Sequence, residues 1–230
     1  VKVRSWFPET LFVEPSLITD ADGSATVNVP LADSITQWRV STMANSVDGK
    51  LGSSADGVVV FQDFFVDIDF PKYLTRGDQI SFPIAVYNYL DVTQNVEIEV
   101  ADADWFELDG TNVVNLALGP GEITGVSFPV TVTKVGWHAL TVYGHGSQMA
   151  DAVQRTVEVK PDGKEVLYTA GAKFASSPTP GQSVQDQVVE TVEIPDNSIE
   201  NSETLVVQIM PGFSSQVVGG MDNMLQLPGG

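Results

Sequence analysis

Few residues of this sequence have types and spacings that could support metal binding. Asp20-Ala21-Asp22-Gly23 has the opening spacing of a calcium loop, but the later oxygen ligands and the late glutamate of such a loop are missing. A β-turn between two strands accounts for these four residues. His138 and His145 lie seven residues apart, without a carboxylate placed to complete a metal site. We therefore predict packing or solvent exposure for both histidines, and no bound metal.

The carboxylates and serines do not form a recognisable catalytic constellation. Asp63, Asp67 and Asp69 fall on one face of a predicted strand, with Phe65 and Phe70 expected on the other side. This arrangement predicts a solvated acidic face. The serines include no Gly-X-Ser-X-Gly nucleophile elbow, and no base and orienting partner can be assembled around them. We expect no catalytic residues, no cofactor and no enzyme activity.

Composition narrows the classes of partner. The 230 residues include 30 acidic and 11 basic side chains, for a formal charge of −19. That balance argues against nucleic acid and against anionic membrane surfaces, both of which are bound through Lys and Arg. No apolar stretch approaches the 18 residues of a membrane span. The sequence has no cysteine and no Asn-X-Ser/Thr sequon, which favours a bacterial protein over an animal extracellular one.

Alternation of apolar and polar residues is the dominant pattern and predicts antiparallel β-sandwiches. Two of the predicted strands contain Pro83 and Pro129, and we expect each of them at a sheet edge or a bulge because proline cannot donate to a ladder. The other clear runs are Ala25–Val29, Gln94–Val100 and Arg155–Val159. Gly- and Asp-containing turns separate the runs, at 20–23, 76–78, 119–122 and 161–163.

The pattern divides the chain into four segments. Residues 1–60 hold three or four strands, too few to close a sandwich, whereas 61–162 hold about seven, as in an immunoglobulin-like domain. Residues 163–213 are acidic, with strands expected near Lys164–Lys173, Val184–Ile194 and Thr204–Met210. Residues 214–230 change to helical spacing, carried by Val217, Val218, Met221, Met224 and Leu225. The aromatic residues Trp6, Phe7, Phe12 and Trp38 could line a ligand groove, but packing in a sandwich core is the favoured interpretation.

Several runs resemble the alpha-2-macroglobulin and complement thioester-protein family, in the expected order. Arg4–Phe12 (RSWFPETLF) is similar to the family's sequence after the bait region, although Leu11-Phe12 stands where many members have tryptophan. Four further resemblances follow, at Pro30–Trp38, Val60–Asp67, Leu74–Asp78 and Val86–Leu90. Ala32 stands where several members have a second proline. The last five residues, Gln226, Leu227, Pro228, Gly229 and Gly230, resemble the approach to the family's thioester cysteine.

The resemblance implies a layout for the whole chain. Residues 1–60 would be the second half of a bait-bearing macroglobulin domain, and 61–162 a complete macroglobulin domain with an immunoglobulin- or fibronectin-like sandwich. Residues 163–213 would be the first half of a CUB-like sandwich, and 214–230 the start of the helical thioester domain. The chain would then be a bacterial-type fragment, running from just after the bait to just before the thioester cysteine. Its positional sites would be the bait flank Val1, Lys2, Val3 and Arg4 and the thioester lead-in Gln226–Gly230.

The function implied is structural, within a broad-spectrum endopeptidase inhibitor that traps proteases after bait cleavage and conformational change. Partners would be target proteases, through the parent protein, and the parent's remaining domains. The location would be extracellular, or the bacterial periplasm and cell envelope. Two alternatives stay open: a complement-like opsonin or adhesin that attaches to surfaces by its thioester, and an immunoglobulin-like surface module without one. Exposed sheet edges are expected in residues 1–60 and 164–213.

Overall fold

The computed structural model describes residues 1–171 and 189–209, and every regular element in them is a β-strand. The predicted all-β class is therefore confirmed. The helix predicted within 214–230 and the lead-in Gln226–Gly230 lie outside the described residues. The strands are β1 Val3–Arg4, β2 Thr36–Asn45, β3 Leu51–Val60, β4 Phe64–Ile68, β5 Tyr73–Thr75, β6 Gln79–Asn88, β7 Gln94–Val100, β8 Phe106–Leu108, β9 Val113–Leu118, β10 Ile123–Val132, β11 Gly136–Gly146 and β12 Ala150–Lys160.

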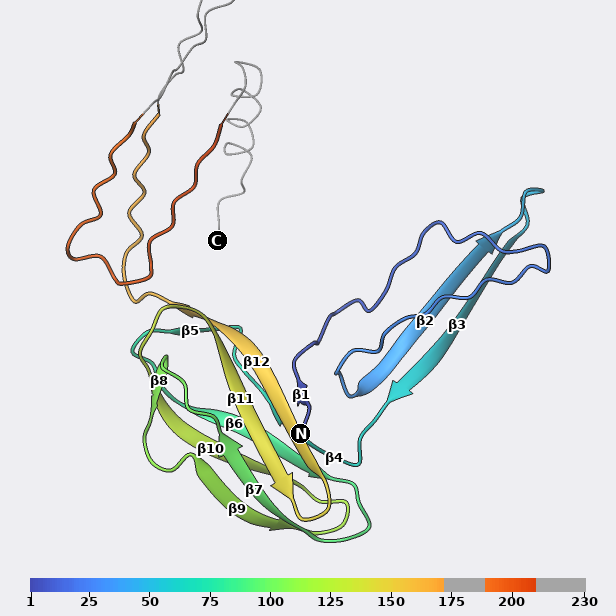
Figure 1. The fold of residues 1–230 in the computed structure, drawn as a ribbon, viewed down its shortest axis with the longest axis horizontal. Helices are drawn as coiled ribbons and strands as arrows, with labels where there is room; N and C mark the ends of the chain where they lie inside the picture. The colour runs from blue at the N-terminus through green and yellow to red at the C-terminus, as the bar shows by residue number, and fades with distance from the viewer. Residues whose placement is uncertain (172–188, 210–230) are drawn as a thin grey trace, which may run out of the picture.

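Strands β4 to β12 form a two-layer sandwich (Figure 1). One sheet has the order β1-β12-β11-β7-β9, with β5 also paired to β12, and the other has the order β4-β6-β10-β8. Alternating side chains of both sheets fill the space between them, including the buried Phe64, Phe82 and Phe128. Trp105, from the turn before β8, is buried among them. The strands number more than the predicted seven because β5 and β8, of three residues each, are too short to show a period.

The prediction that the two proline-containing strands lie at a sheet edge or a bulge is wrong, because both are central and their mutual register is uninterrupted. Strands β6 and β10 occupy the centre of the four-stranded sheet, and each pairs on both sides. Pro83 lies one residue beyond the last β4 partner, Ile84, and Pro129 lies one residue beyond the last β8 partner, Val130. Each proline carbonyl faces the side of the shorter outer strand and accepts a hydrogen bond from the residue just after that strand, Asp69 after β4 and Asp109 after β8. The missing N–H therefore points past the end of that strand, where no ladder bond is required.

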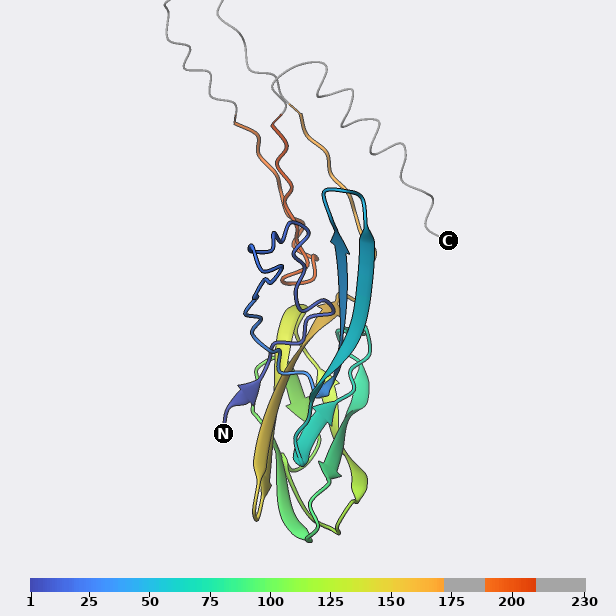
Figure 2. The same ribbon diagram turned by 90° about the vertical axis from the view of Figure 1, so that its right-hand side faces the viewer.

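Residues 5–60 contribute one isolated hairpin. Strands β2 and β3 pair with each other over ten residues each, and almost every residue of both is exposed (Figures 1 and 2). The strand predicted at Ala25–Val29 is not formed, and these residues are mostly exposed without ladder bonds. A two-stranded ribbon is at best marginally stable by itself, so alternation of residue types did not suffice here without partner strands.

The described parts of the acidic segment also form none of the strands expected there. In the described parts, residues 163–171 and 189–209, the chain is extended but makes no strand ladder (Figure 1). Exposed apolar side chains such as Leu167, Val192 and Val206 show the alternating pattern without a sheet to receive them. Alternation of residue types shows that a segment can form a strand, but the strand forms only when a neighbouring strand is available to pair with it. Among the residues described, no helix is long and apolar enough to cross a membrane.

Candidate functional site

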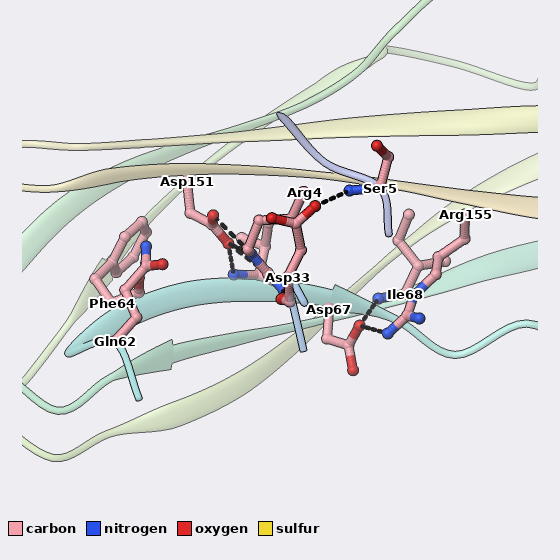
Figure 3. A network of polar contacts seen from close by, with 10 residues as sticks. Arg4, Ser5, Asp33, Gln62, Phe64, Asp67, Ile68, Asp151 and Arg155 are labelled. Atoms are coloured by element: carbon pink, nitrogen blue, oxygen red, sulfur yellow. Dashed lines mark hydrogen bonds and ion pairs between the residues drawn. The ribbon is translucent and has the colours of Figure 1, made fainter. Parts of the chain in front are cut away.

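The predicted bait flank is attached to the sandwich by its last residue. Strand β1 lies parallel to β12, with Val3 opposite Ala152 and Arg4 opposite Val153. Val1 is 68% exposed and the Lys2 side chain 82%, whereas Arg4 is only 8% exposed. The flank therefore passes from solvent at Val1 and Lys2, through the half-buried Val3, to the interior at Arg4. Their attachment point is the candidate site (Figure 3).

Arg4 and Asp151 form a buried ion pair at this point. The Arg4 Nε donates to both carboxylate oxygens of Asp151 at 3.0 and 3.2 Å, and Nη2 donates to Oδ2 at 2.7 Å. The Asp151 residue is 2% exposed. Taking two charges out of water is costly, and only close geometry with further hydrogen bonds repays that cost. The forked contact of the guanidinium with the carboxylate supplies such geometry.

The same pair completes the open edge of a strand. Strand β4 pairs with β6 on one side, and its other side faces the pair. The Val66 N–H donates to Asp151 Oδ2 at 3.0 Å, and the Val66 carbonyl accepts from Arg4 Nη2 at 2.6 Å. Carboxylate and guanidinium thus replace the acceptor and donor that a neighbouring strand would offer. One ion pair joins the N-terminal segment, β12 of one sheet and β4 of the other.

Asp33 holds the backbone that follows β1. Its Oδ2 accepts hydrogen bonds from the amides of Ser5 and Trp6 at 3.0 and 3.1 Å, and its Oδ1 accepts one from Lys2 Nζ at 2.7 Å. Burial raises the pKa of Asp33, but the bonds from Lys2, Ser5 and Trp6 outweigh it and lower the pKa to about 2. The carboxylate is therefore ionised at neutral pH and fixes a loop 28 residues away in sequence.

Phe7 forms a second contact with the sandwich. The Arg155 guanidinium of β12 lies 3.6 Å from the Phe7 ring centroid, and the Arg4 guanidinium lies 5.9 Å from it. Arg155 Nη2 also donates to Asp67 Oδ1 of β4 at 3.0 Å. A planar guanidinium can stack on a ring while its edge binds a carboxylate, which a lysine ammonium cannot do as well. Arg4 and Phe7 thus anchor both ends of a short segment, which we term the anchor segment, Val3–Phe7.

The predicted acidic face is partly wrong. Phe64, Val66 and Ile68 are the buried residues of β4, so Phe65 shares the outer face with Asp67 instead of opposing it. Residues of equal parity lie on one face of a strand, and Phe65 has the parity of the aspartates. Asp67 is also held by Arg155 and is not simply solvated.

The other candidate residues have structural surroundings. The Asp20 carbonyl accepts from the Gly23 amide at 3.1 Å, and the Asp20 carboxylate accepts from the Ser24 amide at 2.8 Å, which is the predicted β-turn. His138 stacks on Trp105 with ring centroids 5.3 Å apart, and His145 stacks on Tyr143 at 6.0 Å. In residues 1–171 and 189–209 no group of three His, Cys, Asp or Glu side chains is placed to hold a metal ion.

The core position expected for the N-terminal aromatics is largely wrong. Trp6 and Phe12 are 44% and 46% exposed, and Trp38 lies half-buried on the hairpin. Only Phe7 packs against the sandwich core. Aromatic residue type predicts burial only where a second layer is present to cover the ring.

Sequence reasoning missed the partners Asp33 and Asp151. The Arg4–Asp151 pair spans 147 positions, so no local spacing indicates it. One signal was available: Asp151 stands directly before the apolar run that opens β12, a charged residue at the start of a buried strand. Asp33 lies inside one of the runs quoted for the family resemblance, but nothing local pairs it with Ser5 and Trp6.

Comparison with known proteins gives a consistent picture. The model of the Alpha-2-macroglobulin family matches residues 10–100. Trypsin-activated alpha-2-macroglobulin from Escherichia coli is 20% identical over 69% of this chain and 12% of that chain, with a TM-score of 0.54. Escherichia coli alpha-2-macroglobulin activated by porcine elastase is 20% identical over 69% of this chain and 15% of that chain, with a TM-score of 0.54. Salmonella alpha-2-macroglobulin reacted with methylamine is 24% identical over 62% of this chain and 10% of that chain, with a TM-score of 0.49. This chain spans about a tenth of the length of these structures.

Proposed function

We propose that this chain is a structural segment of a broad-spectrum endopeptidase inhibitor of the alpha-2-macroglobulin family, whose model matches residues 10–100. The parent protein traps a protease after its bait region is cut and its domains rearrange. In this proposal the chain contributes no catalytic residue and no cofactor. The parent acts in the extracellular space or in the bacterial periplasm and cell envelope. Its partners are the target proteases and the parent's own remaining domains.

One observation carries this proposal: the anchor segment joins an incomplete unit to a complete one. Residues 1–60 hold a hairpin that is exposed on both faces and needs further strands from elsewhere in the parent. Residues 61–162 form a closed sandwich with its own core. The buried Arg4–Asp151 pair connects the two. A conformational change in residues 1–60 can therefore be transmitted to the sandwich when the Arg4–Asp151 pair forms or breaks.

The proposed domain layout follows the same logic. Residues 1–60 are the second half of a bait-bearing macroglobulin domain, with Val1–Arg4 flanking the bait, and 61–162 are a complete macroglobulin domain. Residues 163–213 are the first half of a CUB-like domain, and 214–230 lead into the thioester domain through Gln226–Gly230. The lack of strand pairing in 163–171 and 189–209 supports a half-domain that needs strands from another part of the parent.

Protection of large substrates tests the proposal. The parent polypeptide is incubated with trypsin or elastase, the proteases named for the Escherichia coli relatives. The residual activity is then measured on a protein substrate and on a small chromogenic peptide. A caged protease should lose activity on the protein substrate and keep it on the peptide, because only the peptide can diffuse into the cage. Equal activity on both substrates would refute the trap.

Treatment with methylamine separates two forms of the trap. A live thioester takes up the amine and releases one thiol, which is detected by mass and by thiol titration. Uptake together with loss of protein-substrate protection supports covalent capture. Protection without any uptake supports steric caging alone. Uptake in a parent that protects no protease from its substrate would instead indicate attachment to surfaces.

A further inference from the structure

Four aromatic side chains gather on the outer surface where the hairpin joins the sandwich. We term Phe61, Phe65, Tyr87 and Tyr89 the aromatic cluster. The Phe65 and Tyr87 rings are stacked at 4.3 Å and 14°, and Tyr89 lies nearly parallel to both at 6.2 and 6.3 Å. Phe61, in the link after β3, lies 5.3 Å from Tyr89. The strands that carry the cluster, β4 and the end of β6, are neighbours (Figure 1).

The cluster faces away from the core. Phe64 and Val66, on either side of Phe65, are fully buried, so the pleat directs Phe65 outward, opposite Tyr87 in the register. Phe61 is 56% exposed and Tyr89 43%. Stacked, rigid aromatic rings at a surface are the residues that most often carry binding energy at protein interfaces.

Two acidic residues, Asp63 and Asp91, stand within two residues of cluster members in the chain. Asp63 is joined to Tyr89 through the backbone, and Asp91 follows Tyr89 by two residues. Neither takes part in any ion pair of residues 1–171 and 189–209. The five cations of residues 61–162 lie on other strands and turns: Lys72, Arg76, Lys134, Arg155 and Lys160. The negative faces of the rings and these carboxylates therefore both attract a cation.

Two other aromatic rings near the sandwich surface, those of Phe7 and Tyr73, already hold a cation. Arg155 covers Phe7 at 3.6 Å, and Lys160 lies 4.2 Å from the Tyr73 ring centroid. Within the described residues, no cation of the chain lies over any ring of the aromatic cluster. The chain thus supplies a cation to the rings of Phe7 and Tyr73, whereas the stacked rings of the aromatic cluster have no cation from the described residues.

We propose that the aromatic cluster, with Asp63 and Asp91, binds an arginine-bearing segment of a separate protein. A guanidinium extends the ring stack and pairs with a carboxylate, as Arg155 does with Phe7 and Asp67 inside this chain. The overall charge of −19 attracts a basic partner and repels an acidic one, which favours a partner of this chemistry.

Titration with a model peptide tests the site on the full 230-residue chain. The probe is an acetylated, amidated (Arg-Gly)₄ peptide, and (Gln-Gly)₄ is its uncharged match. Binding is followed by shifts of the tyrosine ring signals in NMR spectra. Y89A should weaken binding of the arginine peptide about two- to fivefold, and F61A/Y89A about tenfold. D63N/D91N should weaken binding and reduce its dependence on salt.

Matched controls keep the result specific. Tyr73 is 50% exposed but already engaged by Lys160, so Y73A should leave the peptide affinity unchanged. E107Q removes an exposed acid on β8 and should also have no effect. Equal losses in Y89A and Y73A, or no binding of the arginine peptide to the wild-type chain, would overturn the proposal. Circular dichroism of each variant establishes that the sandwich is intact.

The parent protein distinguishes a separate partner from a neighbouring domain. A benzophenone-labelled (Arg-Gly)₄ peptide is photo-crosslinked to the chain and to the whole parent, and the sites are mapped by mass spectrometry. Crosslinks near Tyr89 in both proteins support a partner in trans. Crosslinks in the isolated chain that vanish in the parent would assign this surface to another domain of the same polypeptide and overturn the proposal.

Discussion

Replacement of Asp151 by asparagine tests the buried ion pair with the least change in shape. Asp151 accepts three contacts from Arg4 and one from the Val66 amide. Asparagine keeps one carbonyl oxygen but directs an NH₂ donor at the guanidinium donors. Arg4, at 8% exposure, would then be a buried charge without a counterion. Loss of one member of a buried pair costs about 3–5 kcal/mol.

The observed loss depends on how easily Arg4 can leave. Strand β1 has only two residues, so in D151N the anchor segment can detach and return Arg4 to water. The free energy that holds this segment on the sandwich is therefore the upper limit of the loss. We expect a decrease of about 3 kcal/mol in the free energy of unfolding. If detachment occurs first, the amides of Arg4 and Val66 should exchange faster than those of the sandwich core.

Urea unfolding and hydrogen exchange together provide the assay. Near-ultraviolet circular dichroism follows the packed core, in which Trp105 is 2% exposed. Exchange at the amides of Arg4 and Val66 follows the anchor segment. The control is D104N, which breaks an exposed pair with Lys134 and should leave the urea midpoint unchanged. A D151N chain with wild-type stability, within about 0.5 kcal/mol, and wild-type exchange at both amides would refute the role given to the pair.

Three further predictions concern the anchor segment and the core. In a double-mutant cycle of F7L and R155K, the coupling free energy should be about 0.5–2 kcal/mol, measured by urea unfolding; additive effects would contradict the stacked contact. Asp33 has a folded pKa of about 2, below its ordinary 3.8, so its stabilisation of the anchor segment is present above 3.8 and is lost as the pH falls toward 2. Tryptophan fluorescence should follow this loss, and D33N should abolish the pH dependence. G144A places a methyl 2.7 Å from a β4 side chain and should cost about 1–3 kcal/mol, whereas G125A, with 4.0 Å of clearance, should change the unfolding midpoint little.

The sequence by itself predicted the strands that have one buried face and one exposed face. Gln94–Val100 alternates apolar and polar residues and forms β7 over the predicted bounds. The turn at Arg76-Gly77-Asp78 is also found, with Gly77 at a φ of 92°. These features depend only on residues close together in the sequence and on one buried face, so the local sequence predicts them.

Alternation failed where no second surface is present. Ala25–Val29 has the same alternation as β7, yet it forms no ladder and stays largely exposed. A strand is stabilised by the strands beside it and by the layer that covers it, and neither can be inferred from the run itself. The same reason explains the extended chain in residues 163–171 and 189–209.

The candidate site was decided by tertiary structure alone. The sequence indicated Val1–Arg4 as a flank through family resemblance, but it gave no sign that Arg4 is buried. Burial of Arg4 follows from the parallel pairing of β1 with β12, which brings Asp151 beside it across 147 positions. The edge of β4 then supplies a free amide and a free carbonyl at Val66. Local patterns determine which residues can form strands, whereas the pairing of distant charges depends on which strands become neighbours. The reason is that Coulomb and hydrogen-bond energies depend on the distance in space between two groups, and not on their separation in the sequence.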